Sequence, residues 1–363
     1  MQTVYASANR YVQGHGATER LAEEMAFIGL EGPLSILSGP TVRRLLEDTW
    51  QRVLGNAGIE YVLVPFSGEC SRASISSAVQ EITSAGSQVV LGAGGGKVLD
   101  TARAAAAALG KAFVCCPTLA STDSPCSALA IIYSEDGVYE GFDSFGRNPD
   151  LVLVDTEVIL KGPRRYFIAG MGDALSTVFE ARACIQSGHP NLRGGLSTIA
   201  AAQIGEACYR TIMADGRAAL RDMKHGKATA AFERVVEANT LLSGIGFESA
   251  GLAAAHGLHN AFTVAEGTHR SLHGEKVAFG VLAHLVLEHQ PDDVFDDVLA
   301  FCRDVGLPVT LEEIGLSRDD VSTLRAIARQ AVQPGGLIHN EPFEVSEEAV
   351  VQSMLEADRR GRS

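Results

Sequence analysis

The sequence changes character near residue 160, and this change constrains the fold more than any other feature. Upstream of it, short apolar runs alternate with helical patterns, several of which end at a glycine. This alternation is typical of an α/β domain with a mostly parallel sheet and helices on both faces. We expect strands in residues 34–37, 59–66, 87–97 (running into glycines), 111–118, 129–133 and 150–155.

From Gly162-Pro163 onward the patterns are long and helical, and alternating apolar patterns almost disappear. A chain of 363 residues is long enough to form two domains. We therefore predict an α/β domain in residues 1–162 and an all-helical domain in residues 163–363. Gly162-Pro163 is a plausible hinge, because proline fixes φ whereas glycine frees it.

The charge balance excludes some classes of partner. Asp and Glu total 44 against 30 Lys and Arg, for a net charge of -14, which disfavours nucleic-acid binding. Because no run of about 18 apolar residues occurs, we predict no membrane span. The first residues lack a secretory pattern, and the seven scattered cysteines form no CxxC motif, so we expect a reducing, cytoplasmic location.

A glycine-rich loop, Gly92–Lys97, joins an expected strand to an alanine-rich helix. Without Cβ atoms, such a loop lets a phosphate reach the backbone N–H groups and the positive end of the helix. A tight β–α turn explains the same glycines, and the loop matches neither phosphate-binding consensus in full. Asp100 lies one turn after Lys97, where it can pair with a ligand hydroxyl or with the lysine.

A polar loop, Pro117–Pro125, follows the next expected strand. Ligands of open α/β sheets bind outside the carboxyl ends of the strands, so we expect both loops to face one crevice. Thr118 and Ser121 are suitable hydroxyl donors, and Asp123 can accept a hydrogen bond from a substrate hydroxyl. A helix cap or a turn is the alternative interpretation of this run.

Four of the ten histidines lie within residues 256–273. His256 and His259 are three residues apart on an expected helix that follows small apolar residues, so His256 should be buried. A buried imidazole needs a partner, either a metal ion or a backbone carbonyl. His273 begins another expected helix, and Asp173 precedes a long one, where an N-cap is the alternative interpretation. The pattern makes Asp173 and the histidines candidates for a metal site.

Several stretches resemble the glycerol dehydrogenases, the polyol branch of the iron-containing alcohol dehydrogenase superfamily. The resemblance runs from Tyr11 to beyond Asn340, and its motifs are GGGKVLDTARA, PTLASTDSPCSALAIIY, NPDLVLVDT, GMGDALST, EANTLLSGIGFESAGLAAAHGLHNAF and LHGEKVAFG. It implies the dehydroquinate synthase-like fold of that superfamily. The implied activity is reversible, NAD-dependent and zinc-dependent oxidation of glycerol, or a related vicinal diol, with glycerol giving dihydroxyacetone.

The resemblance also implies a ligand set for the zinc ion, namely Asp173, His256 and His273, with one position open for the substrate. Iron-using relatives carry a further histidine one turn after the aspartate, where this chain has Thr177, so zinc is favoured over iron. His259 then becomes a pocket residue that could accept a proton through water.

The resemblance further implies which residues bind the cofactor. They are Gly94, Gly95, Gly96, Lys97, Asp100, Thr118, Ser121, Ser127, Leu129 and Tyr133. Asp123 and Phe247 would contact the substrate.

One position departs from the family. Gly39 stands where glycerol dehydrogenases usually carry an aspartate that accepts a hydrogen bond from the adenosine 2′-hydroxyl. Without that carboxylate, Arg43 or Arg44 could attract a 2′-phosphate, so NADP use is a hypothesis beside NAD.

Other functions remain open from the sequence. The substrate could be another small polyol or a hydroxyketone. Carbocycle-forming lyases and glycerol 1-phosphate dehydrogenases share the fold but need cations for a substrate phosphate, and Arg270 and Lys276 keep these two classes open. A non-catalytic nucleotide-binding module is a further alternative. The resemblance implies a homo-oligomer, with an octamer as the expected form.

Overall fold

The computed structural model describes residues 2–363, which group into two compact units. Ser7–Ala120 and Ser124–Gly162 form an α/β unit, whereas Pro163–Ser363 form a helical unit together with residues 2–6 and Ser121–Asp123. These two short segments distinguish the observed grouping from the contiguous ranges expected from the sequence. Within residues 2–363, no helix combines the length and the apolarity needed to cross a membrane.

The α/β unit is built on a six-stranded parallel sheet with the order β1-β8-β5-β4-β2-β3. Its strands are β1 (Tyr11–Gly14), β2 (Leu34–Ser38), β3 (Tyr61–Pro65), β4 (Val89–Gly94), β5 (Ala112–Pro117) and β8 (Leu151–Asp155). The expected strand 129–133 is β6 (Leu129–Tyr133), which pairs antiparallel with β7 (Tyr139–Ser144) in a separate sheet. The sequence analysis missed β1 and β7, because their half-buried residues form no continuous apolar run.

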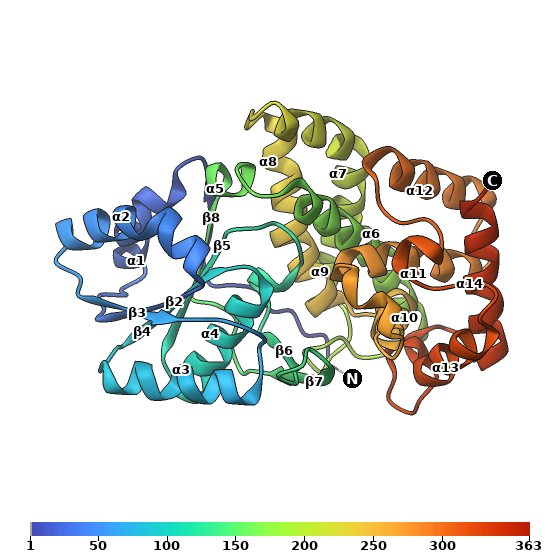
Figure 1. Ribbon diagram of the computed structural model, residues 1–363, viewed down its shortest axis with the longest axis horizontal. Coiled ribbons are helices and arrows are strands. Elements are labelled where there is room, and N and C mark those ends of the chain that lie inside the picture. The colour runs from blue at the N-terminus through green and yellow to red at the C-terminus, as the bar shows by residue number, and fades with distance from the viewer. Residues whose placement is uncertain (1) are drawn as a thin grey trace. The chain divides into compact units, whose positions relative to one another are not determined.

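Helices cover both faces of the parallel sheet. In Figure 1, α1 (Leu21–Phe27) and α2 (Pro40–Asn56) lie on one face, and α3 (Arg72–Ser84) and α4 (Gly96–Ala108) lie on the other. The side chains of β2, β4 and β8 are buried throughout, as expected for parallel strands enclosed on both sides. The unit ends with α5 (Thr156–Leu160) and also contains the short 3₁₀ helices η1 (Ala17–Arg20) and η2 (Ser124–Cys126). The predicted α/β architecture is confirmed.

The strand order places a topological switch point between β2 and β4. The chain leaves β2 toward β3 on one side, whereas it leaves β4 toward β5 on the other. Ligands of open parallel sheets bind at such a point, outside the carboxyl ends of the strands. Here these ends are Ser38 and Gly94, and they are followed by Gly39 and by the glycine-rich loop.

The second unit is helical, as predicted. Its α-helices are α6 (Arg164–Ser187), α7 (Ile199–Lys224), α8 (Ala230–Glu237), α9 (Ser243–Ala250), α10 (Ala254–Phe262), α11 (His273–Leu287), α12 (Asp292–Val305), α13 (Val321–Ala331) and α14 (Glu347–Gly361). A π-helical turn, η3 (Ala238–Leu242), joins α8 to α9, and the 3₁₀ helices are η4 (Glu266–Arg270), η5 (Glu312–Ile314) and η6 (Leu337–Asn340). Helix α6 is central, because it packs against α7, α9 and α11.

Asp173 lies inside α6 rather than before a helix. The helix begins at Arg164 and continues through Gly170 and Gly172. The N-cap interpretation of Asp173 is therefore wrong, and its carboxylate is free for contacts with neighbouring helices.

Candidate metal centre

Asp173, His256 and His273 come together in the helical unit. Asp173 Oδ1 lies 3.0 Å from His273 Nε2 and 3.4 Å from His256 Nε2. A tetrahedral zinc ion about 2.0–2.2 Å from each ligand separates its ligand atoms by roughly 3.3 Å. The three groups therefore have the spacing of a ligand set. The side chain of Asp173 is fully buried, whereas 29% of the His273 side chain is exposed, which leaves one side of the cluster accessible.

Close packing of α6 against α11 brings two of these side chains together. A Cβ atom at Gly172 would lie 2.3 Å from the carbonyl oxygen of Gly274, and one at Gly274 would lie 1.8 Å from that of Ala169. Only glycine permits such an approach of two helix backbones. Because Gly172 precedes Asp173 and Gly274 follows His273, the two glycines fix the distance between these two side chains.

Glu180 orients His256, and the sequence analysis missed it. His256 Nδ1 donates to Glu180 Oε2 at 2.7 Å, since an ionised carboxylate only accepts. Glu180 Oε1 also accepts from the backbone N–H groups of Ala253 and His256, which begin α10. Because Nδ1 is held as the donor to Glu180, Nε2 is the nitrogen that faces Asp173, and it can bind a metal ion in place of its own proton. The partner of the buried imidazole is thus a carboxylate and not the backbone carbonyl considered above.

The charges of the cluster are strongly coupled. Burial alone would raise the pKa of Asp173, but the His273 and His256 imidazoles hold it well below its usual value. Burial opposes protonation of His256, yet Glu180 and Asp173 raise the pKa of this imidazole well above its usual value. A buried site that attracts a proton so strongly also favours a metal cation.

Asp123 and His259 lie beside this cluster. The Asp123 N–H donates to Asp173 Oδ2 at 3.1 Å, and burial together with the Asp173 charge raises the pKa of the Asp123 carboxyl. The His259 ring centroid lies 4.1 Å from that of His273. Burial, followed by the neighbouring His273 and Lys276, lowers the pKa of His259 well below its usual value, so this imidazole is neutral.

Two further positions named from the sequence also lie in the helical unit. Thr177 is buried, and its Oγ1 lies 3.0 Å from the hydroxyl of Ser243 on α9, so this position makes a helix contact. Phe247, on the same helix, is also buried.

The glycine-rich loop forms the junction of β4 and α4. Gly94 ends the strand, Gly95 precedes the helix, and Gly96 and Lys97 begin it. Within residues 2–363, no side chain caps this helix, so its first N–H groups are able to donate hydrogen bonds to an anion. A Cβ atom at Gly94 would lie 2.7 Å from Val98 Cβ, so strand–helix packing alone also requires this glycine.

Asp100 and Lys97 do not pair with each other. Lys97 Nζ contacts Glu69. The buried Asp100 carboxylate accepts from Arg103 Nη1 at 2.5 Å, from Ser124 Oγ at 2.7 Å and from the Ile131 N–H at 3.1 Å. The lysine pairing considered for Asp100 is therefore wrong, and its carboxylate ties α4 to η2 and β6.

The other predicted cofactor residues lie in two places. The Thr118 N–H donates to the Gly94 carbonyl at 3.0 Å, which places the start of the second polar loop against the glycine-rich loop. Ser127 Oγ donates to the Ser124 carbonyl, and Leu129 and Tyr133 are the first and last residues of β6. Ser121 groups with the helical unit, together with Asp123.

At the carboxyl end of β2, Gly39 is the N-cap of α2 and has an extended backbone. Arg43 pairs with Glu47 at 3.0 Å, and Arg44 Nη2 lies 3.4 Å from Thr41 Oγ1. Both cations named for a 2′-phosphate are thus on the first turns of this helix.

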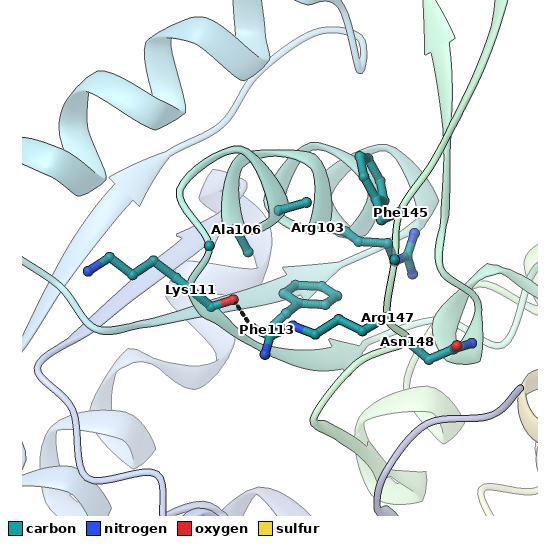
Figure 2. Close-up of a pocket in the computed structure, with 10 residues that line it drawn as sticks. Arg103, Ala106, Lys111, Phe113, Phe145, Arg147 and Asn148 are labelled. Atoms are coloured by element: carbon teal, nitrogen blue, oxygen red, sulfur yellow. Dashed lines mark hydrogen bonds between the residues drawn. The ribbon is translucent and has the colours of Figure 1, made fainter.

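A cavity of about 290 Å³ lies elsewhere in the α/β unit, between α4, β5 and residues 145–148 (Figure 2). Three cations line it, but each already has a partner. Arg103 is bound by Asp100, Lys111 Nζ donates to Gln88, and Arg147 donates to the Lys111 carbonyl. The cavity is lined by residues other than those predicted for the cofactor.

Comparisons with known proteins agree with this architecture. Residues 8–156 match the model of the family described as iron-containing alcohol dehydrogenase. The chain is 45% identical to a glycerol dehydrogenase of Thermotoga maritima, over 100% of this chain and 98% of the relative. It is 40% identical to a glycolaldehyde reductase of Halobacterium salinarum, over 100% of this chain and 99% of the relative.

A solved structure agrees as well. That of a probable glycerol dehydrogenase from Sinorhizobium meliloti 1021 is 38% identical, covers 99% of both chains and has a TM-score of 0.92. The chain therefore belongs to the iron-containing alcohol dehydrogenase family, in its glycerol dehydrogenase branch. It is an oxidoreductase, and the resemblance stated from the sequence is confirmed.

Proposed function

We propose that this protein oxidises glycerol reversibly to dihydroxyacetone, with NAD as the hydride acceptor and zinc as the bound metal. The convergence of Asp173, His256 and His273 carries the proposal. The identity to glycerol dehydrogenases over the whole chain supports glycerol as the substrate.

The donor set fits a divalent ion. One carboxylate oxygen and two imidazole Nε2 atoms lie at ligand spacing, and Glu180 keeps His256 in the ligating tautomer. Three protein ligands of this kind suit zinc and leave a position for substrate. When bound, the ion supplies Lewis acidity toward an alcohol oxygen, and the nicotinamide supplies the hydride acceptor.

The surrounding residues have distinct tasks in this proposal. Asp123, buried beside Asp173, accepts a hydrogen bond from a substrate hydroxyl when ionised and donates one when protonated. Neutral His259 has a ring nitrogen that can take the hydroxyl proton through a water molecule. Phe247 forms an apolar wall that excludes water from the reacting carbon.

The cofactor is assigned to the switch point of the sheet. The N-terminus of α4, with Gly94–Lys97, would bind the pyrophosphate. Asp100, Thr118, Ser121, Ser127, Leu129 and Tyr133 would position the ribose and the nicotinamide. Because Gly39 offers no carboxylate to the adenosine ribose, NADP use is the variant of this proposal. The ratio of kcat/KM for NAD and NADP decides it, and a strong NAD preference would refute NADP use.

Reduction of a small hydroxyaldehyde is the second candidate function. The relative named glycolaldehyde reductase, 40% identical over the whole chain, favours it. Both activities would use the same site, since the reaction is reversible.

The seven free cysteines support a reducing, cytoplasmic location. The family resemblance supports a homo-octamer, which a mass measurement in solution tests.

A steady-state assay tests the proposed function. The zinc-loaded protein is given NAD with glycerol, 1,2-propanediol and other diols, or NADH with dihydroxyacetone and glycolaldehyde, and NADH absorbance is followed. We expect the highest kcat/KM for the glycerol–dihydroxyacetone pair. A higher value for glycolaldehyde would favour the second candidate, and no turnover with any of them would contradict both.

A further inference from the structure

A second cluster of histidine and carboxylate groups lies deep in the helical unit. His284 is on α11, Glu288 follows the end of that helix, and Glu341 follows η6. One ligand atom of each residue lies within 4.8 Å of the other two. The His284 and Glu341 side chains have no exposed surface, and only 9% of the Glu288 side chain is exposed.

The spacing of this cluster repeats that of the metal centre described above. His284 Nε2 lies 3.0 Å from Glu341 Oε1 and 3.4 Å from Glu288 Oε1. These are the same two separations that Asp173 Oδ1 makes with the imidazoles of the first cluster. Both values are close to the roughly 3.3 Å expected between ligands of one tetrahedral zinc ion.

His284 Nε2 lies at ion-pair distance from both carboxylates, but the geometry is not that of a hydrogen bond. Neither ring nitrogen of His284 has a hydrogen-bond partner within residues 2–363, and the same holds for Glu341 Oε2. An imidazolium here would form ion pairs with Glu341 and Glu288 through Nε2, whereas its Nδ1–H would have no hydrogen-bond partner within the described residues. A neutral imidazole can instead direct its Nε2 lone pair at a cation that both carboxylates also bind.

The charge balance leads to the same conclusion. Two buried carboxylates beside a neutral imidazole carry a charge of -2, which a buried site must compensate. A divalent cation would neutralise both carboxylates at once. Glu341 Oε2, which lacks a partner within the described residues, is available as a further donor.

From this convergence we infer that His284, Glu288 and Glu341 bind a second divalent transition-metal ion of the zinc type. The site is sealed, so its ion is structural. Glu341 Oε1 also accepts from the Ala254 N–H at 3.0 Å, at the start of the helix that carries His256. The second ion thereby ties α11 and the segment after η6 to the helix that supplies a ligand of the first ion. The inference is independent of the proposed substrate.

Zinc stoichiometry tests the inference. The full chain is stripped with a chelator, reloaded with Zn²⁺, freed of excess metal and analysed by mass spectrometry for zinc per chain. We expect two ions in the wild type, one in His256→Ala, and one in both His284→Ala and Glu288→Gln. Exposed His225 provides the matched control, since His225→Ala should retain two.

Glu288→Gln keeps the test decisive if His284→Ala does not fold, because Glu288 lies at the edge of the cluster. A wild type with a single ion that His256→Ala removes would overturn the inference, and so would two ions retained in Glu288→Gln. A second readout is thermal unfolding of His256→Ala, whose melting temperature should fall on chelation and recover with Zn²⁺. Zinc per chain is measured without any assay of turnover, so failure of the proposed function and failure of this inference are distinguishable.

Discussion

The two histidine–carboxylate clusters have the same spacing but differ in access and charge. The first combines Asp173 with two imidazoles, one of which, His273, is partly exposed. The second combines one imidazole with two glutamates, and His284 and Glu341 are completely enclosed. Ligand spacing therefore defines a metal site, whereas access decides whether an ion bound there can contact a substrate.

A common element connects the clusters. The N-terminus of α10 donates backbone N–H groups to Glu180 and to Glu341, two buried carboxylates from distant parts of the chain. Glu180 then contacts His256, and Glu341 lies beside His284. Helix α10 is thus held by Glu341 of the second cluster and by Glu180, which orients His256 of the first, so a change at either carboxylate should alter the position of the other.

The largest expected effect is that of His256→Ala on catalysis. It removes one ligand of the accessible cluster, so kcat/KM for glycerol should fall by roughly 10³-fold or more, which corresponds to several kcal/mol. Far-ultraviolet circular dichroism should stay unchanged. Near-native turnover in this variant would place the catalytic ion elsewhere and break the distinction between the clusters.

Gly172→Ala should be the most damaging change for stability around the first cluster. The new Cβ atom would lie 2.3 Å from the Gly274 carbonyl oxygen, so α6 and α11 must separate. Thermal unfolding should show a loss of roughly 3 kcal/mol or more. Gly55→Ala is the matched control, since Gly55 is an exposed position of α2 where a Cβ atom meets no atom within 4 Å. It should stabilise by about 0.5–1 kcal/mol, and equal effects of both changes would refute the packing argument.

Glu180→Gln should lower the zinc affinity of the first cluster more than that of the second. The amide keeps the size of the side chain but weakens the fixation of the His256 tautomer, so affinity at the first cluster should drop about 10–100-fold. A competition titration with a zinc-binding dye measures it. Affinity at the second cluster should change less, and an equal drop at both would show that α10 transmits the whole effect.

Lys276→Met should have the smallest effect of these changes. Its effect on the free energy of unfolding should depend on pH. Burial lowers the pKa of Lys276 to about 8, below the value of about 10.4 in an unfolded chain. The charged lysine therefore destabilises the fold fully below pH 8, and this cost disappears as the pH rises toward 10.4.

Below pH 8, Lys276→Met should accordingly be roughly 1–2 kcal/mol more stable than the wild type in denaturant unfolding, with the gain vanishing above pH 10. Lys224→Met, at an exposed position, is the control and should show no such trend. A gain that is independent of pH would contradict the charge argument.

The sequence predicted much of the fold and part of the site for identifiable physical reasons. Strands buried on both faces are continuous apolar runs, so β2, β4, β5 and β8 were visible. His256 and His273 were predicted on the correct helices. The start of α6 was misjudged, because Gly170 and Gly172 look like the end of a loop, whereas they allow α11 to approach.

The residues that the sequence did not reveal act through tertiary contacts. Glu180 resembles a surface glutamate of an amphipathic helix, although its spacing of seven residues from Asp173 places both on one face. Glu341 lies after a short 3₁₀ helix, where no periodicity points inward. Both become recognisable only when α10 supplies the N–H groups that they accept.

Anomalous diffraction at the zinc absorption edge, from crystals of the zinc-loaded protein, would locate the ion that we propose for Asp173, His256 and His273. We expect a peak about 2.0–2.2 Å from Asp173 Oδ1, His256 Nε2 and His273 Nε2. Density for an active, zinc-containing protein with no peak among these three atoms would contradict it.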